Sequence, residues 1–312
     1  MLKFQDDYNI SIENMEDFIL ISYVMIDDLY QQYAPKEVKE RKNIEKVKLS
    51  DAEIITISIC GELTGMDSEN AWYHFVKKNY RYLFPDLCCR SKFNRKRRDL
   101  LQVTELIREK LIQFFNANDQ DYYIVDSFPL EICKFGRAHF CRNFRSDGAN
   151  YGKCPSKKET YFGFKVHALI TLSGFITAFD ITPASTDDRD GLRDLMSEQY
   201  DISVIGDKGY VGEQLKEDME AQNICLLALK RNNSKMQWSK PFRQMIFKFR
   251  RRVETVFSQL SQQLNAERVL AKTFRGLCTR LVNKILAYDL ALLMNKLFYS
   301  QHPLACIKHL IF

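Results

Sequence analysis

The sequence predicts a mixed protein of the α+β class, with an all-helical N-terminal half followed by a mixed five-stranded sheet flanked by helices. Residues 1–118 carry helical periodicity and helix caps, and from residue 121 short β-rich runs alternate with helical segments. A chain of 312 residues with 46% hydrophobic residues is long enough for two domains. We therefore expect a helical domain at 1–118, a sheet domain at 119–300 with an inserted basic loop at about 133–160, and a C-terminal tail at 301–312.

The helical half contains clear start and stop signals. Ser50 and Glu53 form a capping box ahead of "IITISIC", and Asp67 or Ser68 can cap "ENAWYHFVKKNYRYLF", which Pro85 closes. The following run "SKFNRKRRDLLQVTELIREKLIQFF" starts with a basic turn and continues as an amphipathic helix. A helix start rich in arginine is typical of a DNA reader, although helical bundles without a ligand give the same pattern.

The second half of the sequence contains patterns that predict strands. "DYYIVDSFPLEI" reads as a first strand that ends at Asp126, with Pro129 stopping it, and Ser173-Gly174 joins two further runs as a hairpin. A helix, the strand of "VIGDKGYVG", a second helix, the strand "ICLLALK" and a long helix come next. This order predicts a mixed sheet covered by helices.

The positive charge of the chain is clustered. The balance of 46 Lys+Arg against 40 Asp+Glu gives only +6, but "CRSKFNRKRR", "CPSKK" and "KFRRR" concentrate it. Clustered basic residues indicate a polyanion partner, whereas a single cluster can equally be a solvated face. For the helical half, the candidate DNA contacts are Arg95, Lys96, Arg97 and Arg98.

Cysteine usage and apolar windows bear on the compartment. Nine cysteines, an odd number, and acids in "MLKFQDDYN" in place of a signal peptide predict reduced thiols in the cytoplasm. The most apolar windows are too short or too charged to cross a bilayer, so no membrane partner is expected. A zinc site at Cys133, His139, Cys141 and Cys154 stays open, although their spacings lack two closely paired ligands.

Three acids hold comparable places in this predicted order. Asp126 and Asp207 follow strands, and Glu254 lies at the border of the buried stripe of the long helix. Grouped carboxylates repel one another, and two Mg²⁺ ions are a common compensation in phosphodiester chemistry. The acids of "STDDRDG" (Asp187, Asp188 and Asp190) are open to a helix cap or a metal site, with the cap favoured.

The motifs "IVDSFP", "YFGFKVHALI", "GFITAFDITPAS", "VIGDKGYVG" and "RRVETVFSQL", in this order, resemble the DDE transposases of bacterial insertion sequences. The N-terminal "CRSKFNRKRR" is similar to one branch of them, insertion-sequence family 982. The resemblance covers nearly the whole chain and implies a ribonuclease-H-like catalytic domain. The D, D and E of such enzymes fall on Asp126, Asp207 and Glu254, as catalytic and metal-binding residues.

The resemblance also implies partners and a reaction. Terminal inverted repeats would be bound, and Mg²⁺-dependent cleavage would be followed by strand transfer into target DNA, with two Mg²⁺ ions that Mn²⁺ can replace. A homodimer would join the two ends in a synaptic complex, in a bacterial cytoplasm in association with the nucleoid. Further DNA contacts are expected from Lys165, His167, Lys208, Tyr210, Arg251 and Arg252.

Three rival functions remain at this stage. A ribonuclease-H-like nuclease without strand transfer would use the same acids. A transposase-derived DNA-binding protein without catalysis would not need all three. A metal phosphohydrolase of small molecules would leave the basic helical half unexplained.

Overall fold

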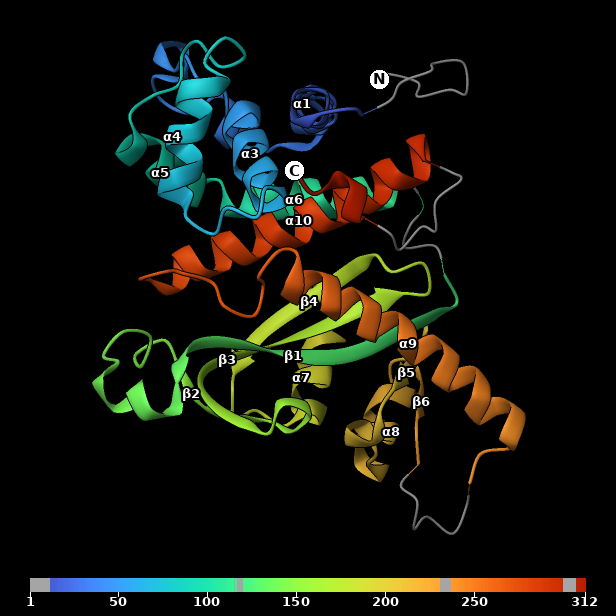
Figure 1. Ribbon diagram of the computed structural model, residues 1–312. Helices are drawn as coiled ribbons and strands as arrows, with labels where there is room; N and C mark the ends of the chain where they lie inside the picture. The colour runs from blue at the N-terminus through green and yellow to red at the C-terminus, as the bar shows by residue number, and fades with distance from the viewer. Residues whose placement is uncertain (1–11, 115, 117–119, 231–236, 300–306) are drawn as a thin grey trace. The chain divides into compact units, whose positions relative to one another are not determined.

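The structure is a computed structural model that describes residues 12–114, 116, 120–230, 237–299 and 307–312 (Figure 1). The chain forms two compact units, which we call unit 1 (Met1–Phe114 with Arg275–Phe312) and unit 2 (Phe115–Phe274). No helix in the described ranges is long and apolar enough to cross a bilayer.

Unit 1 is built from helices whose caps follow the sequence signals. The Ser50–Glu53 capping box is present at the start of α3, and the Ser68 side chain accepts a hydrogen bond from the Ala71 amide at the start of α4. The predicted helix 91–115 is divided at Leu100 into α5 and α6. The α-helices are α1 (Met15–Tyr33), α2 (Lys36–Lys39), α3 (Asp51–Cys60), α4 (Glu69–Asn79), α5 (Arg90–Asp99), α6 (Leu101–Phe114) and α10 (Phe274–Phe298).

Helix α10 and the C-terminal residues belong to unit 1, whereas the sequence analysis placed residues 275–300 with the sheet domain and 301–312 in a separate tail. Charged groups explain part of this grouping: Lys284 of α10 pairs with Glu62, and Asp289 lies 3.6 Å from Arg108 of α6. The last residue is also anchored, because the Phe312 amide donates to the Leu63 carbonyl at 2.8 Å. Residues 300–306 lie outside the described ranges.

Unit 2 contains a mixed sheet in the order β2-β3-β1-β5-β6, with β4 paired to β3. Within the described residues it has six strands and not the expected five. The additional strand, β2, lies in the predicted basic loop, where its sequence "NYGKC" lacks a β-rich run but pairs with the start of β3. The strands are β1 (Tyr122–Lys134), β2 (Asn150–Cys154), β3 (Glu159–Thr171), β4 (Ile176–Pro183), β5 (Ser203–Gly206) and β6 (Cys225–Ala228).

Strand β1 corrects another expectation, because it continues through Pro129 to Lys134 and places Asp126 inside the strand. β1 pairs with β5 only as far as Ile124, so beyond this point one edge of β1 has no strand beside it. The Glu131 amide points to that edge, since it donates to the Glu267 carbonyl at 2.7 Å. Pro129, two residues earlier, has the same orientation and therefore removes no hydrogen bond to β3.

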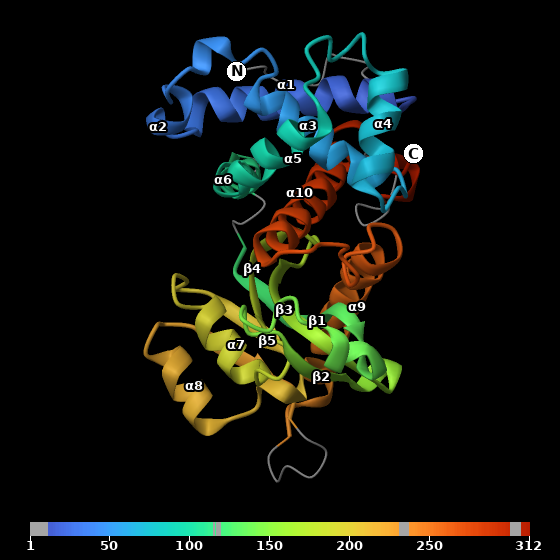
Figure 2. The same ribbon diagram turned by 90° about the vertical axis from the view of Figure 1, so that its left-hand side faces the viewer.

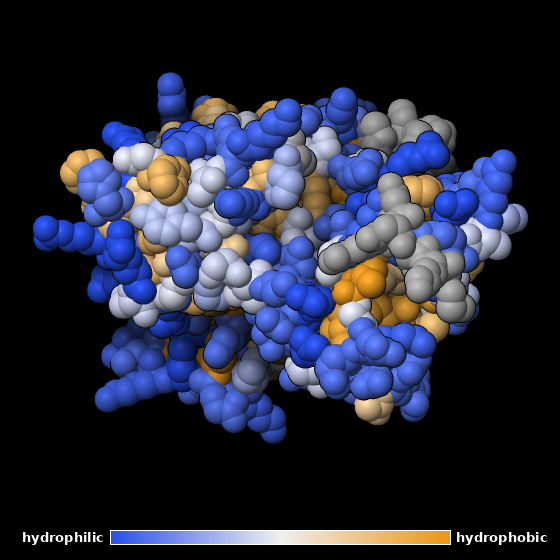
Figure 3. Space-filling view, turned by 90° about the horizontal axis from the view of Figure 1, so that it is seen from below, coloured by the Kyte–Doolittle hydropathy of each residue, from blue (hydrophilic) through white to orange (hydrophobic). Residues whose placement is uncertain are grey.

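Helices cover both faces of the sheet in unit 2. Figure 2 shows α7 (Asp188–Leu195) and α8 (Glu213–Glu220) on one side and α9 (Lys240–Gln262) on the other. A hydrophobic core that includes Tyr123 and Tyr210 joins β1 and β5 to α7 and α8, while Phe128 of β1 packs on Phe257 of α9 with ring centroids 4.9 Å apart. The face in Figure 3 is mainly hydrophilic, with apolar side chains gathered only in small areas. The open edge of β1 therefore lies between the layer of α7 and α8 and the layer of α9.

Candidate functional site

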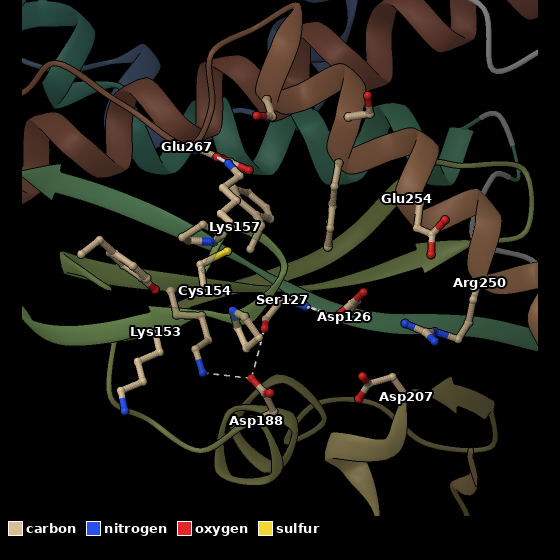
Figure 4. A pocket seen from close by; sticks show the side chains of 18 of the residues that line it. Asp126, Ser127, Lys153, Cys154, Lys157, Asp188, Asp207, Arg250, Glu254 and Glu267 are labelled. Atoms are coloured by element: carbon tan, nitrogen blue, oxygen red, sulfur yellow. Dashed lines mark hydrogen bonds and ion pairs between the residues drawn. The ribbon is translucent and has the colours of Figure 1, made fainter. Parts of the chain in front are cut away.

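A pocket of about 630 Å³ in unit 2 contains the three acids that the sequence singled out. Asp126 comes from β1, Asp207 follows β5, and Glu254 lies on α9 (Figure 4). The lining also includes Ser127, Phe128, Pro129, Lys153, Cys154, Pro155, Lys157, Tyr161, Lys165, Asp188, Arg250, Phe257, Ser258, Ser261, Gln262 and Glu267. The fold thus brings acids from three separate elements to the open edge of β1.

The Asp126 carboxyl is largely buried, and this burial is the main reason why its pKa rises from 3.8 to about 7. The charges of Asp207 and Asp188 raise the pKa further, while the Ser127 amide, which donates at 2.8 Å, and Arg250 lower it. A carboxyl with this pKa loses its proton near neutral pH, and a nearby cation would favour the ionised form.

Asp207 emerges where strand β5 ends, as the sequence predicted. Its carboxylate accepts a hydrogen bond from the Gly209 amide at 2.6 Å, which fixes the side chain at the start of a short 3₁₀ turn. A Cβ at Gly209 would lie 2.9 Å from the Asp207 carboxylate and 3.4 Å from that of Asp188. Glycine at this position therefore keeps space free between the two acids.

Glu254 is exposed at the border of the buried stripe of α9, in which Val253, Val256 and Leu260 are buried. Ser258 and Ser261, on the following turns, line the same pocket. Figure 4 shows the Arg250 guanidinium pointing into the part of the pocket that also receives the Asp126, Asp207 and Glu254 carboxylates.

Asp188, at the start of α7, adds a fourth carboxylate to the pocket wall. It accepts hydrogen bonds from the Lys165 ammonium at 3.0 Å and from the Ser127 hydroxyl at 3.1 Å. Its neighbour Asp187 is the helix cap, accepting from the Arg189 amide at 2.9 Å. The sequence thus predicted the cap correctly for Asp187, while Asp188 faces the pocket.

The donor set suits a hard divalent cation, because Mg²⁺ prefers carboxylate oxygens. Across the described ranges, no three His, Cys, Asp or Glu side chains already stand in a ligand-like group. Carboxylates that are brought together repel one another, and a divalent cation would offset this repulsion. Cys133, His139, Cys141 and Cys154 form no such group either, and burial together with Cys141 raises the pKa of Cys133 to about 11.

Some of the basic residues predicted to contact DNA are exposed to solvent, and others donate hydrogen bonds to groups within the protein. Arg95 and Lys208 are exposed, as is Arg251, and Lys96 and Arg98 are partly exposed. Lys165 lines the pocket but is tied to Asp188 and to the Thr186 carbonyl. The Arg252 side chain is partly buried and donates to the Leu172 carbonyl at 3.0 Å.

Three of the predicted contacts are buried and therefore do not fit the expectation. Arg97 is 7% exposed and pairs with Glu69 within unit 1. His167 is fully buried beside Thr182 and against Gly191 of α7, where an added Cβ would lie 2.3 Å from the imidazole. Tyr210 is 1% exposed in the hydrophobic core of unit 2.

Arg250 was not identified from the sequence, and for Asp188 the sequence pattern favoured a helix cap over a metal site. A signal for Arg250 exists, because residue 250 precedes Glu254 by four positions and so shares its helix face. Asp188 had no such signal, since its contacts with Ser127 and Lys165 join segments about 60 and 20 residues away.

Comparisons with known proteins identify the family of the segment that contains the pocket. A solved structure with a similar fold is a "Cryo-EM structure of piggyBac transposase synaptic complex with hairpin DNA", with 10% sequence identity and a TM-score of 0.49 over 94% of this chain and 78% of that one. No curated protein sequence matches the chain. A protein-family model described as "Transposase DDE domain" matches residues 116–271, which is half of the chain and includes Asp126, Asp207 and Glu254. The chain therefore belongs to the transposase family that is defined by this DDE domain.

Proposed function

We propose that the protein is an insertion-sequence transposase that binds terminal inverted repeats, cleaves strands at the element's ends and transfers them to target DNA. The observation that carries the proposal is the meeting of Asp126, Asp207 and Glu254 in a single pocket, within the segment that matches the DDE domain. A ribonuclease-H-like core is part of the proposal and is supported by the mixed sheet with helices on both faces.

In this proposal, Asp126, Asp207 and Glu254 hold two Mg²⁺ ions, for which Mn²⁺ can substitute. Bound cations would supply an activated water or sugar hydroxyl and would stabilise the leaving oxygen. The chain's own contribution is positional: the Gly209 amide fixes Asp207, and the Ser127 amide fixes Asp126. The negative field around Asp126 and Asp207 favours cations at the open edge of β1.

DNA contacts are assigned to the accessible basic residues. On α5 these are Arg95, Lys96 and Arg98, and in unit 2 they are Lys208 and Arg251, with Arg250 at the pocket. Lys165 and Arg252 stay in the proposed set although each already donates a hydrogen bond within unit 2. Arg97, His167 and Tyr210 leave this set because they are buried. Joining two element ends requires two active sites, so we also propose a homodimer in the synaptic complex, in a bacterial host of family 982 elements.

Cleavage of a DNA fragment that carries the element's own ends tests the proposal. The wild-type chain is expected to cut at the ends in Mg²⁺ and not in EDTA, and to join the freed 3′ ends to a target plasmid. Asp126→Asn, Asp207→Asn and Glu254→Gln should each abolish cutting while DNA binding in a mobility-shift assay is retained.

Asp201→Asn, at an exposed bend ahead of β5, is the matched control and should cut normally. Cutting without joining would instead identify a nuclease, and binding without cutting by the wild-type chain would identify a catalytically inactive DNA-binding protein.

A further inference from the structure

The segment from the last residue of β1 to the residue before β3, residues 134–158, is rich in positive charge. We call it the insertion. It carries seven lysines and arginines against one aspartate, a balance that equals the +6 of the entire chain. The remainder of the protein is therefore neutral overall, so a polyanion would be attracted to locally basic segments, of which the insertion and the helix α5 are two.

Several of these charges are available for a partner. Arg137, Arg142, Lys153 and Lys158 are exposed, and no hydrogen bond or ion pair joins them to another side chain in the described part of unit 2. Lys134 and Lys157, in contrast, pair with Glu159 and Glu267. The insertion thus presents four basic side chains that are not neutralised by the protein itself.

The insertion also exposes aromatic rings. Phe135 is 59% exposed, Phe140 75% and Tyr151 40%. The Phe135 and Tyr151 rings contact each other with centroids 5.5 Å apart, and Tyr151 lies 5.4 Å from Phe162 of β3, over which Arg145 sits. Exposed rings held by ring contacts of this kind are rigid apolar surfaces.

The insertion is joined to the acidic pocket through β2. Lys153 and Cys154, which follow Tyr151 on this strand, line the pocket of Asp126, Asp207 and Glu254. β2 itself is firmly placed on β3, because Gly152 packs so closely against Tyr161 and Ala184 that a Cβ would lie within 3 Å of both. A ligand on the insertion would therefore lie next to the proposed cleavage site.

We infer that the insertion binds unpaired DNA, with bases stacked on Phe135, Tyr151 and Phe140 and phosphates held by Arg137, Arg142, Lys153 and Lys158. Stacking on a protein ring needs an open base face, which a strand offers where it leaves the duplex. The excess of positive charge on the insertion favours a polyanion. Its exposed aromatic rings favour unpaired DNA over a duplex, because only unpaired bases can stack on them. This inference rests on the proposed function, since the adjoining pocket would receive the strand at its cleavage point.

Binding measurements in EDTA test the inference separately from cleavage. The full-length chain is titrated into a fluorescein-labelled single-stranded oligonucleotide and, in parallel, into the duplex of the same sequence, with anisotropy as the readout. Phe135→Leu combined with Tyr151→Leu keeps apolar side chains but removes the rings. It should weaken single-strand binding by at least about tenfold, because stacking contributes roughly 5- to 150-fold per base, and should leave duplex binding unchanged.

The controls separate stacking from charge. Tyr200→Leu changes another exposed ring of unit 2, 72% exposed, and should bind both probes as the wild type does. Arg137→Gln combined with Arg142→Gln should weaken the binding of both probes and reduce the salt dependence of that binding. Unchanged single-strand binding by the leucine pair, or equally tight binding of polyglutamate, would overturn the inference. If the leucine pair loses single-strand binding while the wild type never cuts DNA, the proposed function fails and this inference stands.

Discussion

Glu62 in unit 1 and Asp126 in unit 2 are both largely buried carboxyls, yet their pKa values shift in opposite directions. Burial alone would raise the pKa of Glu62, but Lys284 and Arg280 outweigh it and lower the value. Their nitrogen atoms lie 2.5 and 2.9 Å from the Glu62 oxygens. For Asp126, burial and the charge of Asp207 outweigh Arg250 and raise the pKa to about 7.

The difference is in the source of positive charge. Unit 1 supplies two buried cations from α10 to one buried acid, and so links its N-terminal and C-terminal segments. In the pocket of unit 2, Lys165 pairs with Asp188 and Lys157 with Glu267. The remaining charged residues of the lining are three acids, Asp126, Asp207 and Glu254, and two bases, Lys153 and Arg250. An acid cluster with this excess of negative charge suits an external cation, whereas the Glu62 cluster is complete by itself.

Glu62→Gln should produce the largest effect on stability. It removes the Glu62 charge from the buried Lys284 and Arg280, of which Arg280 keeps a longer pair with Glu69, and breaking a buried pair in this way costs about 3–5 kcal/mol. Calorimetry should show a lower unfolding temperature, and hydrogen exchange should locate the faster exchange in α10. Glu37→Gln, an exposed glutamate of α2, is the control. A loss no larger than that of the control would contradict the assignment of Glu62 as a structural acid.

Asp126→Asn should have the opposite effect on stability, because it should increase the free energy of unfolding at high pH. The folded-state pKa lies above the ordinary value of 3.8, so the folded chain holds this proton more tightly. The contribution of Asp126 to the free energy of unfolding therefore falls as the pH rises from about 4 to about 7, by up to about 4 kcal/mol. At pH 8 in EDTA the asparagine variant should be more stable than the wild type, and at pH 4 this advantage should disappear.

Added Mg²⁺ provides the second arm of this experiment. It should stabilise the wild type at pH 8 and have little effect on Asp126→Asn, because the ionised carboxyl is a proposed ligand. Equal unfolding temperatures of the two chains at pH 8 in EDTA would show that burial does not penalise the Asp126 charge. Asp201→Asn again provides the matched control.

Much of the fold follows from local signals in the sequence. The Ser50 capping box, the Ser173-Gly174 hairpin and the strand before Asp207 depend on neighbouring residues, and all are present. β2 and the continuation of β1 through Pro129 depend instead on pairing with β3, which is distant in sequence. The placement of α10 in unit 1 likewise depends on ion pairs to Glu62, more than 200 residues away.

The candidate site could likewise be predicted only where it depends on local sequence patterns. Sequence patterns located Asp126, Asp207 and Glu254, because each follows or lies within a recognisable element. They did not distinguish Arg97, which is buried with Glu69, from its accessible neighbours on α5. His167 and Tyr210 were also misplaced, since burial depends on the helices that pack over the sheet and not on the residue type.

The most direct test of the central claim compares the two candidate third acids of the pocket, Glu254 and Asp188, in single-turnover cleavage of end-containing DNA in Mg²⁺. Asp188 already pairs with Lys165 and accepts a hydrogen bond from Ser127, whereas the Glu254 carboxylate has no hydrogen bond or ion pair to any side chain in the described ranges. Glu254→Gln should slow cleavage by about 10³-fold or more, as expected for loss of a charge that acts in the transition state, and Asp188→Asn should keep most of the rate. Near-normal cleavage by Glu254→Gln together with loss of cleavage in Asp188→Asn would contradict the assignment.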